Sequence, residues 1–144
     1  MNKVKFWRTT GKYGCFSNFS KHPIFYHGIE FKTSEHLYQA LKMSDISGFH
    51  MVRKCPTPKA AKELAYTLSM VSNGELIKYD TMLQVLQLKF DQHDSIHDIL
   101  LDTNDMVIEE DSPYDYIWGT GKDGSGKNLL GKAWMQIRED NNDV

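Results

Sequence analysis

Hydrophobic residues recur at the spacing of an α-helix in the stretch TSEHLYQALKMSD, residues 33–45. Thr33 or Ser34 can cap its first turn, because a side-chain oxygen there accepts a hydrogen bond from a backbone N–H that the helix leaves free. The residues expected to face a core share one side of this helix and are Leu37, Ala40 and Leu41.

Another side of this predicted helix holds a carboxylate and an amine. Glu35, Gln39 and Lys42 are spaced at i, i+4 and i+7 and therefore share one face. The helical rise puts the backbones of Glu35 and Lys42 about 10 Å apart, so both side chains can reach a small molecule between them. Such a pair suits acid, base or covalent catalysis. The alternative is an exposed face of salt-bridged charges, which is the usual role of a charged helical surface.

The rest of the chain alternates short strands with helices. Strands are predicted at 4–7, 24–26, 29–31 and 106–109. His27-Gly28 supplies a tight hairpin turn between the second and third of them, with Gly28 at a positive φ. Further helices are predicted at 47–54, 58–66, 81–92 and 95–101, and a last one opens at 128–131.

Two helix starts carry recognisable signals. Thr57 is suited to be an N-cap with Pro58 in the first helical position. Asp80 is suited to cap the helix 81–92, so residues 71–78 are expected to be a loop. One stripe of the helix 81–92 is typical of a core and comprises Met82, Leu83, Leu86 and Phe90.

A loop of turn-forming residues is predicted at 11–20. Within it, Ser17 and Asn18 lie between Phe16 and Phe19, which can anchor the loop in a core. Ser17 and Asn18 offer hydrogen-bond donors and acceptors to a ligand. The alternative is an Asx or Ser turn that closes the loop.

Composition indicates one ordinary globular domain. The chain has 144 residues, of which 40% are hydrophobic and 25% charged. The net charge of −2 gives no basic footprint for nucleic acid, although it does not exclude a nucleic-acid substrate held by one small pocket. Two cysteines without a CxxC motif, and no signal peptide or apolar run long enough for a membrane, favour the cytoplasm and no membrane contact.

The Gly-rich stretch matches two nucleotide-binding patterns incompletely. Gly119, Gly121 and Gly124 fit G-x-G-x-x-G, but too little chain follows for a dinucleotide fold. Residues 121–127 fit G-x-x-x-x-G-K, but Asn128 follows where a P-loop has Ser or Thr. A Gly-rich turn before a helix can still expose backbone N–H groups to phosphate. The alternative is a tight loop with left-handed residues.

One pair of histidines has the spacing of metal ligands on a helix. His93 and His97 lie at i and i+4, but the chain has no HExxH motif and no third ligand in evidence. We therefore expect no metal and no cofactor.

Several segments, taken in order, resemble a known family. They are FSNF at 16–19, EHLYQALK at 35–42, TP at 57–58 with AAK at 60–62, KFDQ at 89–92, EDSPYD at 110–115, and WG at 118–119 leading to NLLG at 128–131 and IR at 137–138. Their order resembles the NADAR superfamily and its YbiA-like branch over nearly the whole chain. One departure lies before the helix 81–92, where the family usually has a Trp and this chain has Gly74 or a neighbour.

The resemblance implies a fold and an activity. The fold would be α+β and predominantly helical, with a small β-sheet or hairpin, as a single domain over 1–144. The activity would be that of an N-glycosyl hydrolase, which cleaves the bond between a ribose and a nitrogen base. Two substrates are associated with the family: ADP-ribose attached to guanine in nucleic acid, which we favour here, and phosphoribosylamino-pyrimidine intermediates of riboflavin biosynthesis. A monomer is the expected state.

The resemblance also implies site residues. They are Glu35, Lys42, Asn18, Glu110, Asp115, Trp118, Gly119, Asp123 and Asn128. We expect Glu35, Lys42 and Glu110 to be catalytic, and the remainder, together with Ser17 and Gln39, to bind substrate. For Trp118 the alternative is a core tryptophan, and for Asp115 it is a carboxylate that caps a turn.

Two mechanisms are open for these residues. Glu35 or Glu110 can stabilise an oxocarbenium-like sugar or activate water. Alternatively, the ribose ring opens and Lys42 attacks its C1 as an imine, which requires a lowered pKa. We favour the covalent route. A binding module for ADP-ribose or a nucleotide is the competing function from another class, and the Glu35–Lys42 pair argues against it, because a module without turnover has little use for it.

Overall fold

The computed structural model describes residues 2–68 and 75–142. Its described residues form six α-helices, one short 3₁₀ helix and four short strands, which confirms the predicted α+β, mostly helical class. The chain divides into two compact units, Met1–Ser17 with His93–Val144, and Asn18–Gln92. The single domain over 1–144 therefore stays a prediction.

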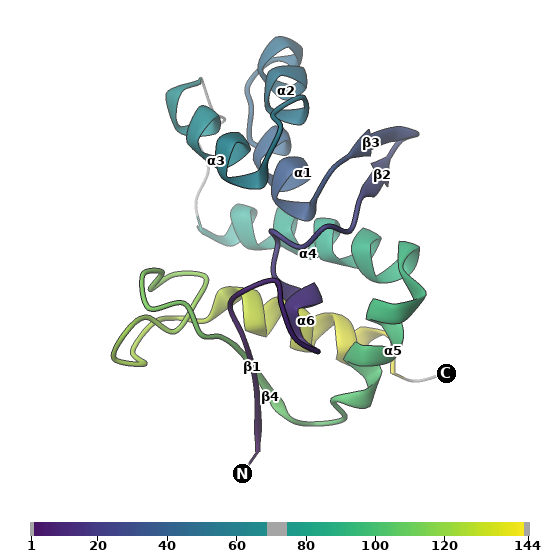
Figure 1. The fold of residues 1–144 in the computed structure, drawn as a ribbon, viewed down its shortest axis with the longest axis vertical. Coiled ribbons are helices and arrows are strands. Elements are labelled where there is room, and N and C mark those ends of the chain that lie inside the picture. The colour runs from purple at the N-terminus through teal and green to yellow at the C-terminus, as the bar shows by residue number, and fades with distance from the viewer. Residues whose placement is uncertain (1, 69–74, 143–144) are drawn as a thin grey trace. The chain divides into compact units, whose positions relative to one another are not determined.

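The first unit is built on a pair of parallel strands, β1 (Lys3–Phe6) and β4 (Val107–Glu110), in which Val4 is opposite Ile108. Strand β1 buries every second residue, as a strand with one covered face does. Helix α6 (Leu129–Asp140) packs on β4, and α5 (Asp94–Asp102) lies against α6 (Figure 1).

The core of the first unit gathers around Trp134 on α6. Its ring lies 5.1 Å from that of Phe16, which ends the short 3₁₀ helix η1 (Gly14–Phe16), and Phe6 meets Phe16 edge-on. The indole N–H of Trp134 donates to the carbonyl oxygen of Phe16 at 2.9 Å. The tryptophan is therefore buried without losing a hydrogen bond, and it ties the N-terminal loop to the last helix.

The second unit packs helices around α1. The strands β2 (Ile24–Tyr26) and β3 (Ile29–Phe31) form the predicted antiparallel hairpin, and both His27 and Gly28 have a positive φ, as its tight turn requires. Helix α1 (Ser34–Leu41) follows and contacts α2 (Ile46–Arg53), α3 (Pro58–Thr67) and α4 (Glu75–Gln92) (Figure 1).

The predicted caps Thr33 and Thr57 are confirmed, since each side chain accepts a hydrogen bond from a backbone N–H in the first turn of its helix. The predicted extension of the first helix to residue 45 is wrong, because α1 ends at Leu41. Asp45 instead caps α2, where its carboxylate accepts from Gly48 N–H at 2.7 Å. The segment predicted as one helix therefore contains the end of α1 and the cap of α2.

The start of α4 also differs from the prediction. The described part of α4 starts at Glu75, so the loop predicted at 71–78 is wrong for 75–78, and its residues 71–74 lie outside the described part of the chain. Asp80 is inside the helix and not its cap. Thr81 Oγ1 donates to the carbonyl oxygen of Ile77 at 3.0 Å, a contact one helical turn back. No Gly or Pro interrupts residues 75–92, so the helix continues through Asp80.

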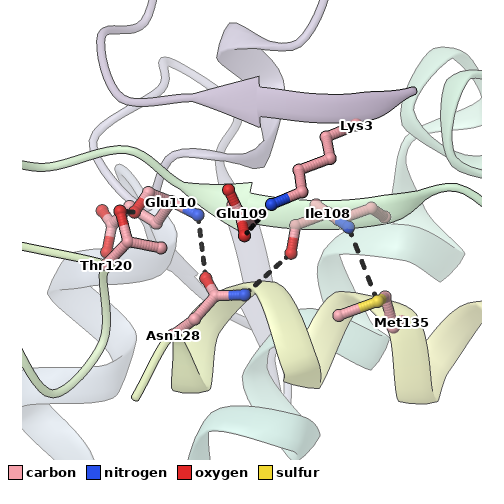
Figure 2. Close-up of polar contacts among 7 residues, drawn as sticks. All are labelled: Lys3, Ile108, Glu109, Glu110, Thr120, Asn128 and Met135. Atoms are coloured by element: carbon pink, nitrogen blue, oxygen red, sulfur yellow. Dashed lines mark hydrogen bonds and ion pairs between the residues drawn. The ribbon is translucent and has the colours of Figure 1, made fainter. Parts of the chain in front are cut away.

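Asn128 fastens α6 to β4. It precedes the helix with a left-handed backbone, φ 54°. Its Oδ1 accepts from Glu110 N–H and its Nδ2 donates to the Ile108 carbonyl, both at 2.9 Å (Figure 2). One amide side chain thus completes two hydrogen bonds on the edge of β4. Gly131 lies so close to the Ile108 carbonyl that a Cβ would clash with it.

Replacing Asn128 is expected to destabilise the protein. Asn128→Ala leaves one N–H and one C=O of β4 without their partner, which costs about 2–4 kcal/mol in the free energy of unfolding. Asn128→Gly loses the same two bonds but tolerates the positive φ, so it should be more stable than the alanine variant by about 1 kcal/mol. Urea unfolding followed by circular dichroism measures both. Equal stability of wild type and Asn128→Ala would contradict this role.

Candidate functional site

The structure buries the polar residues of α1 that were predicted to act on substrate. Glu35 is 6% exposed and Gln39 is 4% exposed. Gln39 Nε2 donates to Glu35 Oε2 at 2.6 Å, so the two residues one turn apart form a hydrogen-bonded pair. The alternative of an exposed, salt-bridged helix face is wrong. A carboxylate taken out of water and held in one orientation is suited to chemistry.

Asn18 supports the first turn of α1. Its carbonyl oxygen accepts from Glu35 N–H at 3.0 Å, and its Oδ1 accepts from the Ser34 hydroxyl at 2.9 Å. Its Nδ2 lies 3.4 Å from the sulfur of Met82 on α4. These contacts make Asn18 a cap for the helix that carries Glu35. Its predicted contact with substrate stays a prediction.

A buried lysine, Lys89 of α4, was absent from the predicted site. It is 0% exposed, and its Nζ donates to the hydroxyls of Ser20 at 2.8 Å and Ser34 at 3.3 Å. The signal in the sequence was a charged residue within the apolar stripe. Lys89 lies seven residues after Met82 and three after Leu86, on the face that α4 buries.

Lys42 directly follows α1 as its C-cap and is half-buried. Its ammonium lies 5.2 Å from the centre of the Tyr38 ring. Burial lowers the pKa of Lys42, and the nearby charges of Lys78 and Lys62 lower it further, while Glu35 acts in the opposite direction. A lysine with a lowered pKa has more neutral amine near neutral pH, which is the form that attacks a carbon.

His36, which follows Glu35 in α1, is held at both ring nitrogens. Its Nδ1 lies 2.8 Å from Thr33 Oγ1, and its Nε2 lies 2.9 Å from the carbonyl oxygen of Cys55. Because a carbonyl only accepts, Nε2 carries the proton of the neutral ring. Burial lowers the pKa of His36; the hydrogen bond to Cys55 partly opposes this, and Lys32 adds to it.

The other predicted residues belong to the first unit, where Asp115 turns the chain. Its Oδ1 accepts from the N–H groups of Ile117 and Trp118 at 2.9 and 2.8 Å, the turn-capping role given above as the alternative. Trp118 is half-buried, and the fully buried tryptophan of this unit is Trp134. A Cβ on Gly119 would lie 2.9 Å from the Asp115 carbonyl, so close packing explains this glycine.

The Gly-rich stretch does not form a phosphate cradle at the start of α6. The N–H groups of Lys127, Asn128, Leu129 and Leu130 donate to the carbonyls of Tyr116, Gly119, Ile117 and Trp118. The backbone donors that an anion would need are already used within the loop. The structure therefore supports the alternative of a tight loop, in which Gly121 and Gly124 have a positive φ, and it removes the basis for a P-loop.

Three further predicted residues belong to the first unit. Glu110 ends β4 and is half-buried, with its backbone held by Asn128 and Thr120. Asp123 is exposed and accepts from the N–H and the hydroxyl of Ser125, which lower its pKa. Ser17 is buried directly after η1. Their roles toward substrate stay predictions.

Within the described residues, no three side chains of His, Cys, Asp or Glu gather in a way that could hold a metal ion. The two histidines singled out for their spacing have other positions: His93 is the residue that precedes α5, and His97 pairs with Asp98 at 3.1 Å. Gly74, where the sequence departs from the family pattern, lies outside the described residues. None of the described helices combines the length and the apolar character needed to span a membrane.

Comparison with known proteins identifies the family. The model of the NADAR domain matches residues 5–140. The chain belongs to the NADAR family. An N-glycosidase of Nostoc punctiforme, Npun_R5314, is 35% identical to this NADAR chain over 142 residues, which are 95% of this chain and 91% of that protein.

Solved structures and further relatives agree with this family. The NMR structure of Escherichia coli YbiA matches this NADAR chain with a TM-score of 0.87 and 34% identity, over 95% of this chain and 83% of that one. A maize relative named riboflavin biosynthesis protein PYRR is 31% identical over 96% of this chain, which corresponds to 25% of the maize protein. Because E. coli YbiA and the Nostoc protein are both named N-glycosidases, the predicted enzyme class is confirmed.

The buried His36 should make the stability of this NADAR protein depend on pH. Its folded pKa lies below the ordinary value of about 6.5, so the unfolded chain binds a proton more readily than the folded chain does. The contribution of His36 to the free energy of unfolding should therefore fall as the pH drops below about 6.5 and stop falling below the folded pKa of His36. Urea titrations at several pH values measure it. His36→Gln, which does not titrate, should have a flatter profile, and identical profiles would refute the assignment.

Proposed function

We propose that this NADAR protein is an N-glycosidase that removes ADP-ribose from guanine in nucleic acid, with Lys42 as nucleophile and Glu35 as its acid–base partner. The single observation that carries the proposal is a cluster of like charges. Lys42, Lys62 and Lys78 come from α1, α3 and α4, each is half-buried, and both Lys62 and Lys78 act electrostatically on Lys42.

This lysine cluster suits a phosphate-bearing ligand. Like charges that are partly withdrawn from water repel one another, and Glu35 offsets only part of this repulsion at Lys42, so binding of an anion would be favourable. Among the described residues, no ion pair joins Lys42, Lys62 or Lys78 to an acidic side chain. A diphosphate, as in ADP-ribose, gives Lys62 and Lys78 one phosphate each and leaves Lys42 for the sugar. A monophosphate uses the cluster less completely.

The chemistry follows from the two groups on α1. In the proposed reaction, the neutral amine of Lys42 bonds to C1 of the ribose, the bond from C1 to the base nitrogen breaks, and the base leaves with a proton. The sugar ring opens, and its ring oxygen becomes a hydroxyl as the imine forms. Water then adds to the imine and releases the sugar and the lysine. The Glu35 carboxylate, held by Gln39, is suited to move the protons in these steps.

A second candidate substrate is a phosphoribosylamino-pyrimidine intermediate of riboflavin biosynthesis. The observation that favours it is the name of the maize relative. Its single phosphate also suits the lysine cluster, and the same Lys42 chemistry applies to its C1–N bond. The roles proposed for Glu110, Ser17, Asp115, Trp118, Gly119, Asp123 and Asn128 are shared by both candidates.

Turnover assays separate the candidates. Wild type should release ADP-ribose from guanine-modified DNA over many turnovers, and Lys42→Met and Glu35→Gln should each lose about 10²-fold or more in kcat. The pyrimidine substrate is assayed in parallel. Turnover of the pyrimidine alone would select the second candidate, and binding without turnover of either compound would select the binding module.

Borohydride reduction tests the nucleophile directly. Wild type mixed with substrate should retain the sugar on Lys42, found by peptide mass spectrometry, and Lys42→Met should not be labelled. Lys62→Ala should raise the pKa of Lys42, because it removes a repelling charge, and should shift the rise of trapping rate with pH to higher pH. Lys59→Ala is the matched control, since Lys59 lies on the same helix and is exposed. An equal shift in both variants would argue against the cluster.

A further inference from the structure

The face that α4 buries carries two polar contacts to the start of α1. Met82 meets the Asn18 amide, and Lys89, seven residues later on the same face of α4, donates to Ser34. Both contacted residues are bonded to each other, since the Ser34 hydroxyl donates to Asn18 Oδ1 at 2.9 Å. Helix α4 therefore contacts the first turn of α1 directly at Ser34, and indirectly through Asn18.

The direction of these hydrogen bonds follows from the lysine. An ammonium has three donors and no acceptor, so the Ser34 oxygen accepts from Lys89. The single proton of the Ser34 hydroxyl is then available to Asn18, whose Oδ1 lies at 2.9 Å and whose backbone carbonyl oxygen lies at 3.3 Å. In the structure the Asn18 amide has its oxygen toward Ser34 and its nitrogen toward the Met82 sulfur.

Glu35, the proposed acid–base residue, is connected to both Ser34 and Asn18. Glu35 follows Ser34 in the chain, and its backbone N–H donates to the carbonyl of Asn18 at 3.0 Å. The position of the Glu35 backbone therefore depends on where Ser34 and Asn18 lie. The side chain of Glu35 is in turn oriented by Gln39.

A lysine at position 89 is unfavourable for stability if its side chain serves only to pack the buried face of α4. Removing an ammonium from water is unfavourable, and the start of a helix carries a partial positive charge that repels a cation. Leu or Met would fill the apolar stripe between Leu86 and Phe90 without either penalty. The hydrogen bonds that Lys89 makes are what an apolar residue could not supply.

We propose that Lys89 is a positioning residue, which holds Glu35 in its reactive orientation through Ser34 and Asn18. The proposal rests on the proposed catalytic role of Glu35. The proposal assigns different roles to the two serines that Lys89 contacts. Ser34 directly precedes Glu35 in the chain, whereas Ser20 contacts His22, whose Nδ1 lies 2.9 Å from the Ser20 oxygen.

The two serines provide a matched pair for the test. Both are buried, and either alanine variant removes one acceptor from Lys89. Ser34→Ala is expected to lower kcat by about 10- to 100-fold, the loss that a displacement of about 1 Å can cause, with KM within about twofold. Ser20→Ala should keep kcat within about threefold. Lys89→Met should resemble Ser34→Ala.

A second measurement does not depend on the substrate. Native-state hydrogen exchange at the Glu35 amide, relative to the Leu37 amide on the same helix, should be faster in Ser34→Ala and Lys89→Met and unchanged in Ser20→Ala. A merely structural lysine would accelerate exchange at both amides alike. Equal losses of kcat in the two serine variants, or no selective change at Glu35, would overturn the proposal. If wild type turned over neither substrate, the proposed function would fail and the exchange data would still decide the positioning role.

Discussion

The buried carboxylate of Glu35 is the feature on which the second unit depends most. A carboxylate removed from water is stable only where donors surround it or its helix. The unit provides these by closing the first turn of α1 with Thr33, Asn18 and Ser34, and by placing Gln39 one turn later. The hairpin β2–β3 and the long helix α4 are packed around this turn. The fold of the unit thereby keeps the Glu35 carboxylate, the proposed acid–base group, buried and in one orientation.

The two ends of α1 differ in their electrostatic surroundings. At its start, Glu35 lies within a hydrogen-bonded setting that Lys89 anchors through Ser34. At its end, Lys42 is half-buried near two other lysines, which lower its pKa. The backbones of Glu35 and Lys42 lie about 10 Å apart along the helix axis, so the proposed acid–base group and the proposed nucleophile start from positions of fixed spacing. That spacing is independent of loop conformation.

The first unit uses its polar residues in another way. The side chain of Asn128 forms hydrogen bonds with backbone groups of β4, and that of Asp115 with backbone N–H groups of the loop that follows it. The N–H groups at the start of α6 donate to carbonyl oxygens of residues 116–119 in the same loop. These residues shape the segment that carries Trp118 and Gly119. Any contact they make with a substrate would have to come from the remaining atoms of the loop, among them the half-buried Trp118 ring.

Local pattern was enough to predict much of this protein. Caps at Thr33 and Thr57, the turn at His27-Gly28 and the helical period of α1 are short-range effects, because each depends on residues within one turn of chain. The order of motifs was likewise sufficient for the family. Local pattern was insufficient at Asp45, which caps α2 and lies beyond the end of α1, and at Asp80, which lies inside α4.

Only the tertiary structure decided which polar residues are buried and what they contact. The spacing of Glu35, Gln39 and Lys42 was readable, but their removal from water depends on α2, α3 and α4 packing around α1. Lys89 reaches Ser34 across 55 positions of sequence, and Asn128 reaches Ile108 across 20. Burial, pKa and hydrogen-bond partners depend on neighbours that are distant in the chain, and no local period or propensity specifies these.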